Sequence, residues 1–237
     1  MAPATRPISG CSLGDTSARL RFRSMSHLVL PDVLRDSSNL EAAVEHLRDY
    51  CAPRRDGLGP VFTGSQFESF EKSASLPDQI GTADLLAVTM LGVDVPGEAS
   101  LRILGTDSEE IQQLLSAIPN DVDFIDATEP LLRGQAAWKL WTIIDGYDDV
   151  GPTITSKIMA RKRPALIPVQ DSVIRKALGY RQGMGDFWAH LRALLSGYDF
   201  KAAMQTIRDQ AAVERPFSDL RVFDIVVWMD HRRKRFV

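Results

Sequence analysis

Cysteine is scarce in this chain of 237 residues. Only Cys11 and Cys51 occur, far apart and outside any CxxC spacing, which excludes a disulfide framework, a zinc finger and a four-cysteine iron–sulfur cluster. The four histidines also lack metal-ligand spacing; they are His27, His46, His190 and His231. We therefore expect no metal, no iron–sulfur cluster and no other cofactor, with the histidines on the surface or in the core.

Long apolar runs are missing as well. No run reaches the roughly 18 residues that span a bilayer, and the N-terminus has no apolar signal segment. The net charge of -3 excludes a protein that coats nucleic acid through its bulk charge, so any DNA contact must come from a local patch. Gly-rich phosphate loops and the GxSxG and HExxH motifs are also absent. We expect a cytoplasmic protein that does not enter membranes.

Strand patterns are nearly absent, whereas helical spacing recurs from about Asn39 onward. Thr82 is expected to cap one helix, and Thr106 with Glu109 to form the capping box of another. The first helix is indicated by apolar residues at helical spacing, namely Leu40, Ala43, Val44, Leu47 and Tyr50. Further helices are expected over 135–145, 152–163, 172–178, 185–195, 200–212 and 218–229. The sequence therefore predicts an all-α fold.

The chain is expected to divide into an arm and a helical domain. Residues 1–38 are Ser- and Arg-rich at their start and lack hydrophobic periodicity, which predicts a disordered arm or a DNA-contacting tail. Residues 39–237 form the predicted helical domain. Its last residues include the basic run 232–235, which is either a solvated helix end or a phosphate contact.

Residues 144–163 predict a helix, a hairpin turn and a second helix. The first helix ends near Asp145, and Pro152 occupies a first helical turn, where its missing N–H costs nothing. Backbone N–H groups at Val150 and Gly151, together with the helix dipole, can hold one phosphate of a DNA strand. The Val150 side chain is expected to be buried between the two helices. Asp149 precedes it, and Asp tolerates left-handed geometry better than most residues.

The charge beside this turn is basic. Between Gly151 and Leu178 the sequence has six cations and a single anion, Asp171. This pattern predicts either a basic DNA-contacting patch that includes Lys157 and Arg161 or a solvated amphipathic helix with ordinary surface charges.

The segment resembles the helix-hairpin-helix DNA glycosylase superfamily. Its hairpin is followed by a helix, the proline-containing link Pro164 to Pro168, and Asp171, which lies 20 residues after Gly151 and three before Ile174. The spacing matches that family's signature, although Gln170 stands where the family has valine. A weaker resemblance upstream places the family's early helix at 85–91, and Asp94 near its duplex-inserting loop. The resemblance implies two helical lobes with a cleft between them.

The resemblance also implies an activity. Asp171 is the counterpart of the catalytic carboxylate, which stabilises positive charge on the deoxyribose while the target nucleotide is extruded from double-stranded DNA. Thr153 stands where bifunctional members have a lysine, which favours a monofunctional enzyme that leaves an abasic site. Lys157 lies one turn later and is expected to bind phosphate, although a displaced lyase lysine is an alternative. The implied DNA-binding residues are Asp94, Asp149, Val150, Gly151, Thr153, Lys157 and Arg161.

Other interpretations of the same residues remain. Asp171 before a helical segment is also an ordinary N-cap. Aromatic candidates for a base pocket are Tyr147, Phe187 and Trp188, whereas Trp138 and Trp141 are expected to pack the core. The chain could be a non-catalytic DNA-binding module with this fold, or a protein-interaction domain in which the hairpin is only a turn. In a glycosylase, the substrate could be a damaged base in the genome or a modified base in invading DNA.

Overall fold

The computed structural model describes residues 28–38, 40–127, 135–181, 183–184 and 186–234, and it is all-α as predicted. Within these ranges the chain forms helices, turns and loops without a β-strand. The folded structure begins before position 39, because Leu28 and Leu34 are buried and the Val29 N–H donates to the Leu178 carbonyl at 2.9 Å. The folded part therefore starts earlier than expected. The rest of the predicted arm, residues 1–27, lies outside the described residues.

The described helices begin close to the expected positions in the second half of the chain. Short 3₁₀ turns cover Thr63–Gln66 and Lys72–Ala74, and a π turn covers Arg102–Thr106. The helices are α1 (Asp32–Arg35), α2 (Glu41–Cys51), α3 (Thr82–Thr89), α4 (Gly97–Leu101), α5 (Ser108–Ser116), α6 (Ala136–Asp145), α7 (Pro152–Lys162), α8 (Ser172–Ala177), α9 (Phe187–Ser196), α10 (Phe200–Ala211) and α11 (Asp219–Arg233).

Two of the expected helix caps are wrong. The N-cap of α3 is Gly81, whose N–H donates to the carboxylate of Asp84 at 3.0 Å, and Thr82 is already helical. The N-cap of α5 is Asp107, and Thr106 ends the preceding π turn without capping a helix. The Asp84 carboxylate, at the third position of α3, reaches back to the Gly81 N–H and supplies the polar partner expected from Thr82.

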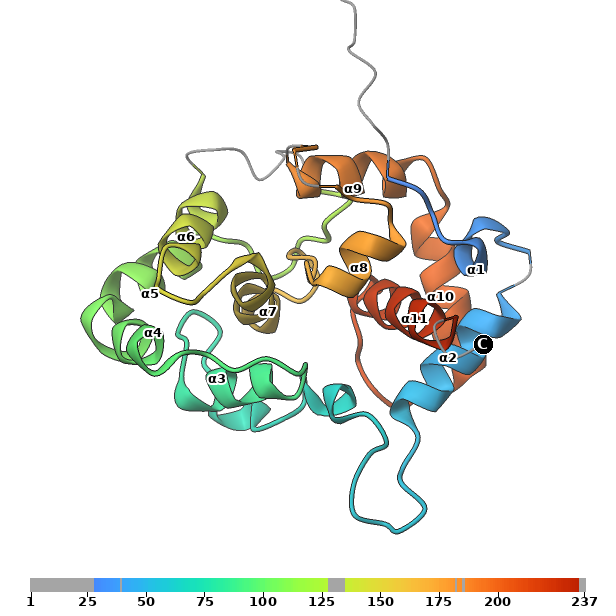
Figure 1. Cartoon of the computed structure of the whole chain (residues 1–237), viewed down its shortest axis with the longest axis horizontal. Coiled ribbons are helices and arrows are strands. Elements are labelled where there is room, and N and C mark those ends of the chain that lie inside the picture. The colour runs from blue at the N-terminus through green and yellow to red at the C-terminus, as the bar shows by residue number, and fades with distance from the viewer. Residues whose placement is uncertain (1–27, 39, 128–134, 182, 185, 235–237) are drawn as a thin grey trace, which may run out of the picture.

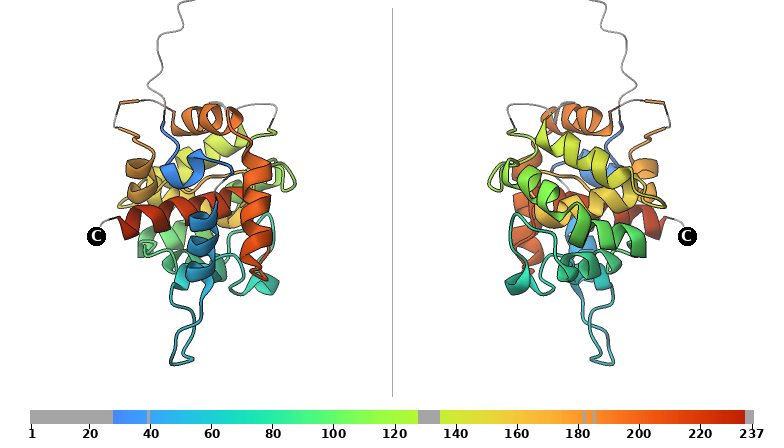
Figure 2. Two further views of the ribbon diagram at one scale, coloured as in Figure 1. Left: turned by 90° about the vertical axis from the view of Figure 1, so that its right-hand side faces the viewer. Right: turned by 90° about the vertical axis from the view of Figure 1, so that its left-hand side faces the viewer.

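Closely packed helix pairs fall into two groups. In the first group α3 packs against α7, α7 against α6, and α6 against α5, and the π turn packs against α5 and α4. These elements lie at the left of Figure 1. Helices α1, α2, α8, α10 and α11 pack with one another at the right. The left view of Figure 2 shows α11 running across α2 and α10, which lie alongside each other. Buried apolar side chains from both groups form one continuous core.

Helix α7 runs through the interior and brings its cations with it. Every residue from Thr155 to Lys162 is buried, and Arg163 directly after the helix is 2% exposed. An unpaired charge in such a place costs several kcal/mol, so each cation needs acceptors. The predicted exposed basic patch is therefore wrong for Lys157, Arg161, Lys162 and Arg163, and Arg161 cannot contact DNA from this position.

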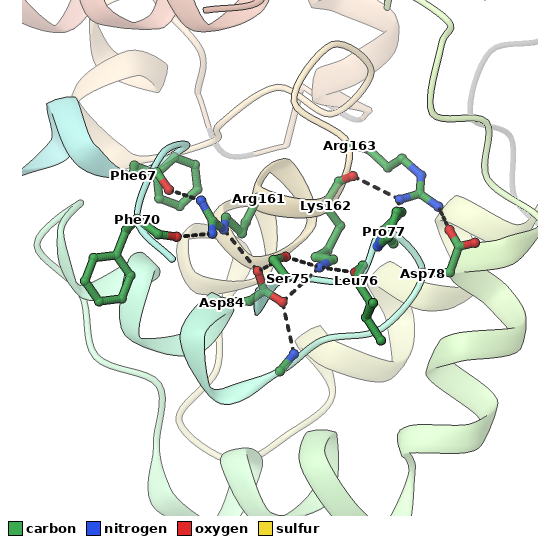
Figure 3. A network of polar contacts seen from close by, with 11 residues as sticks. Phe67, Phe70, Ser75, Leu76, Pro77, Asp78, Asp84, Arg161, Lys162 and Arg163 are labelled. Atoms are coloured by element: carbon green, nitrogen blue, oxygen red, sulfur yellow. Dashed lines mark hydrogen bonds and ion pairs between the residues drawn. The ribbon is translucent and has the colours of Figure 1, made fainter. Parts of the chain in front are cut away.

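Most acceptors of Arg161 and Lys162 come from the segment between α2 and α3 and from the first turn of α3, as Figure 3 shows. The Asp84 carboxylate accepts from Arg161 Nε at 3.0 Å and from Lys162 Nζ at 2.8 Å. The guanidinium of Arg161 also donates to the carbonyls of Phe67 and Phe70. Arg163 pairs with Asp78 at 2.6 Å. These bonds fix an irregular stretch of chain against α7.

Asp84→Asn is expected to destabilise the protein by about 3–5 kcal/mol, because it leaves Arg161 and Lys162 buried without a counter-charge. Urea unfolding followed by circular dichroism measures the loss. Asp32→Asn is the matched control, since the Asp32–Arg35 pair is exposed and contributes at most about 1 kcal/mol. Equal stability of the two variants would contradict the assigned role of the network.

Candidate functional site

The hairpin between α6 and α7 forms as predicted. The Val150 N–H donates to the Tyr147 carbonyl at 3.1 Å, Asp149 has the left-handed φ of 58°, and Pro152 opens α7. The Val150 side chain is buried. Gly151 has open space where a Cβ would stand, so the N-terminal end of α7 is accessible beside an exposed Asp149.

Asp171 lies at the start of α8 and has two contacts. Its Oδ1 accepts from the Ile174 N–H at 2.8 Å, which makes it the N-cap of that helix. Its Oδ2 lies 3.9 Å from Nζ of Lys157, and its side chain is 14% exposed. The expected cap is confirmed, and the same carboxylate also faces a pocket.

The pocket has a volume of about 340 Å³ and is lined by segments from both groups of helices. A volume of about 300 Å³ or more is typical of small-ligand sites. Its polar lining consists of Thr63, Lys157, Asp171, Arg221, Asp224 and Arg232. Its apolar lining consists of Tyr50, Val61, Phe62, Met90, Leu91, Val169, Ile225 and Trp228. The pocket thus combines charged groups with aromatic rings.

Three aromatic side chains pack together in the pocket wall. The rings of Tyr50 and Phe62 stack with centroids 5.5 Å apart, and Trp228 meets Phe62 edge-on at 5.7 Å. The guanidinium carbon of Arg232 lies 5.0 Å from the Trp228 centroid and 5.6 Å from that of Phe62. Arg232 is exposed, so it places a cation beside the aromatic rings and open to solvent.

The floor of the pocket is a buried ion cluster around Arg221. Arg221 Nε lies 2.6 Å from Glu68, and its other nitrogens contact Asp224, the Tyr50 hydroxyl at 2.9 Å and the Gly64 carbonyl at 3.0 Å. Arg221 is 5% exposed and Asp224 is 7% exposed. The cluster therefore ties α11 to α2 and to the loop after it.

Burial shifts the acid–base properties of these groups. Desolvation raises the pKa of Asp224 to about 7 against the opposing charge of Arg221, and the negative charges of Asp171 and Glu68 add to the rise. Desolvation also raises the pKa of Glu68. Burial lowers the pKa of Lys157, while Asp171 and Asp224 counteract that shift. A carboxyl that titrates near neutral pH is suited to proton transfer.

A family model described as a family of unknown function, DUF6308, matches residues 43–231. The chain belongs to this family. The matched region extends from α2 to α11 and contains the pocket residues from Tyr50 to Trp228. Searches of curated proteins and of solved structures found no match.

In this DUF6308 protein, some predicted site residues meet and others do not. Asp171 and Lys157 share the pocket, and Lys157 donates to the Leu91 carbonyl at 2.9 Å, so its expected exposure to phosphate is wrong. Thr153 is half-buried and makes a long contact of 3.4 Å with the Gln170 carbonyl. Asp94 is exposed in the loop after Gly92, which itself lines the pocket.

The predicted aromatic residues lie elsewhere. Tyr147 is buried and donates from its hydroxyl to Asp107 at 2.9 Å. Phe187 packs against Tyr180, and Trp188 packs edge-on against Trp141 and Trp138 in the core. The pocket aromatics were missed because Tyr50 and Trp228 fit the apolar faces of their helices. In the sequence nothing separates such residues from ordinary core positions.

Two further observations concern metals and membranes. Within the described ranges, no group of three His, Cys, Asp or Glu side chains is placed to hold a metal ion. Among the described helices, none combines the length and the apolar character that crossing a membrane requires.

Asp171→Ala is expected to destabilise the protein by about 1 kcal/mol because α8 loses its cap, whereas Asp171→Asn keeps the cap and changes stability little. Urea unfolding measures both. Asp186→Ala removes the cap of α9, which bonds the Trp188 N–H at 3.0 Å, and it is the matched control. A loss as large in Asp171→Asn as in Asp171→Ala would contradict a capping role.

Proposed function

We propose that this protein is a monofunctional DNA glycosylase of the helix-hairpin-helix type, which excises a damaged or modified base. One observation carries the proposal: the carboxylate 20 residues after the hairpin glycine faces a pocket with aromatic walls. The N-cap role of Asp171 explains its position on α8, but it does not explain why Oδ2 faces a pocket that also holds Lys157.

In the proposed reaction Asp171 acts at the sugar of an extruded nucleotide. Loss of the base builds positive charge on the deoxyribose, and the carboxylate stabilises that charge and orients or deprotonates the attacking water. Phe62 and Trp228 offer flat apolar surfaces on which a base can stack. Thr153 replaces the lysine of bifunctional enzymes, so an abasic site is the expected product.

The fold supports this proposal through the position of the pocket. Leu91 and Lys157 come from the group of helices that contains α3 and α7, whereas Tyr50 and Trp228 come from α2 and α11. We interpret the two groups as the two lobes of a glycosylase and the pocket as part of the cleft between them. Double-stranded DNA is then the partner.

In this proposal the DNA contacts do not come from a basic patch on α7. The accessible N–H groups at Gly151 and the start of α7 hold one phosphate, with the exposed Asp149 limiting the strength of that contact. Asp94, in the loop beside the pocket, is proposed as the counterpart of the family's duplex-inserting loop. Arg232 takes over the role of an exposed cation near the pocket, since Lys157 and Arg161 are buried.

Asp171→Asn is expected to lower base excision by about 100-fold or more while DNA binding persists. The measurement uses duplexes with a panel of altered bases, followed by alkaline heating that breaks abasic sites, and a gel shift for binding. Asp186→Asn is the matched control because it changes a cap outside the pocket. Wild-type protein that binds without strand breaks on any substrate would favour a non-catalytic module. Absence of salt-sensitive binding would favour a protein-interaction domain.

Arg232→Ala is expected to weaken DNA binding and to reduce the slope of log affinity against log salt by about 1, because one phosphate contact is lost. Binding titrations at several salt concentrations measure the slope. Arg233→Ala is the matched control, since Arg233 is engaged with Asp49. An equal change in the two variants would remove Arg232 from the proposed interface.

A further inference from the structure

Asp224 is a second carboxyl group that lines the pocket. Its position in the sequence of α11 does not reveal that its side chain is buried. Asp224 lines the same pocket as Asp171 and comes from a different helix, α11. One oxygen, Oδ2, contacts Arg221, whereas Oδ1 is buried and accepts no hydrogen bond from the described residues. A buried carboxylate oxygen without a donor is costly, and a bound proton removes that cost.

The cations around Asp224 are shared with other groups. Arg221 on α11 contacts both Asp224 and Glu68, the latter from the loop after α2. Lys157 on α7 lies 3.9 Å from Asp171 and donates to the Leu91 carbonyl. Asp224 therefore has only a shared counter-charge in a desolvated place, where a carboxyl group takes up a proton.

The position of the neighbours indicates which carboxyl holds that proton. The negative charges of two other carboxyl groups, Asp171 and Glu68, raise the pKa of Asp224. Glu68 faces two cations, Arg221 and Arg161, and it does not line this pocket. The oxygens of Asp171 already have partners, because Oδ1 accepts the Ile174 N–H and Oδ2 lies 3.9 Å from Nζ of Lys157. The proton therefore belongs on Asp224, whose pKa of about 7 agrees.

We propose that Asp224 is the proton donor to the departing base, so that the enzyme acts on uncharged altered bases. This inference rests on the proposed glycosylase function. Asp171 is the carboxylate that works at the sugar, and Asp224 is the carboxylic acid that works at the base. The two carboxyl groups thus divide the work of acid and base within one pocket.

The proposed step conserves protons and electrons. The bond between C1′ and the base nitrogen breaks, its electron pair stays with the base, and the Asp224 carboxyl proton moves to a ring nitrogen of that base. Water adds its oxygen to C1′ and gives a proton to Asp171. The proton on Asp171 then returns to solvent and Asp224 takes one up, which restores both groups.

The proton donor defines the substrate class. An uncharged base leaves as an anion unless it is protonated, whereas a base that already carries a positive charge from alkylation leaves as a neutral molecule. A carboxylic acid in the pocket therefore accelerates only the first class. The acid form of Asp224 is lost as pH rises through about 7, so excision of uncharged bases falls above that pH.

The test compares two duplex substrates, one with hypoxanthine as an uncharged base and one with 7-methylguanine as a cationic base. Asp224→Asn is expected to lower excision of hypoxanthine by about 100-fold or more and excision of 7-methylguanine by less than about tenfold. Asp219→Asn on the same helix is the matched control, because Asp219 pairs with Arg208 outside the pocket. Thermal unfolding shows whether each variant is folded.

A second measurement needs no variant. Wild-type excision of hypoxanthine is expected to fall about tenfold per pH unit above pH 7, while excision of 7-methylguanine stays level. Equal losses for both substrates, excision of the cationic base alone, or a level profile for hypoxanthine would overturn the role of Asp224 and leave the glycosylase proposal standing. Wild-type protein that excises neither these bases nor any other of the panel would overturn both.

Discussion

Burial of the cations on α7 is the constraint on which the rest of the structure depends. A helix that carries Lys157, Arg161 and Lys162 into the interior is stable only where carboxylates and carbonyls meet each of them. The Asp84 carboxylate in the first turn of α3 and the carbonyls of Phe67 and Phe70, between α2 and α3, accept from Arg161 and Lys162, and the Leu91 carbonyl accepts from Lys157. Because those bonds replace hydration, the irregular segment is held in one arrangement against α7.

The same segment connects α7 to the pocket. The Phe67 carbonyl accepts from Arg161 on α7, and the next residue, Glu68, pairs with Arg221 on α11. Arg221 in turn contacts Tyr50 and Asp224. Phe67 and Glu68, adjacent in the chain, thus fix the distance between α7 and α11. The pocket floor follows from this link, and so does the position of Asp224 relative to Asp171.

The sequence predicted what local rules decide. Pro152 at a helix start, Asp149 in the turn and Asp171 before α8 all follow from backbone preferences, and the structure has each of them in place. The catalytic role expected of Asp171 rested on its spacing to Gly151, and only the structure shows that Asp171 lines a pocket. The exposed basic helix was wrong, since the acceptor for Arg161 is Asp84, which is 77 residues away. Periodicity cannot distinguish a solvated cation from one that a distant segment neutralises.

The pocket wall was out of reach for a related reason. Tyr50, Phe62 and Trp228 come together only because α2 and α11 cross, and the order of crossing helices is a property of the whole core. For Arg232 the charge was evident from the sequence, but its aromatic neighbours were not. The sequence placed it in a basic run at the chain end, and only its stacking over Trp228 distinguishes it from Arg233, which pairs with Asp49.

The charged groups of the pocket limit what can occupy it. Asp171 and Asp224 line the pocket, while Arg221 is held by Glu68 and Lys157 by the Leu91 carbonyl. In the proposed reaction the Asp171 carboxylate stabilises a group on which positive charge develops, because opposite charges interact strongly where water is excluded. Phosphates would then remain outside, near Arg232 and the hairpin, while the sugar and base enter. The buried charges and the exposed ones thus favour opposite parts of a nucleotide, and a strand bound with one nucleotide turned inward satisfies both.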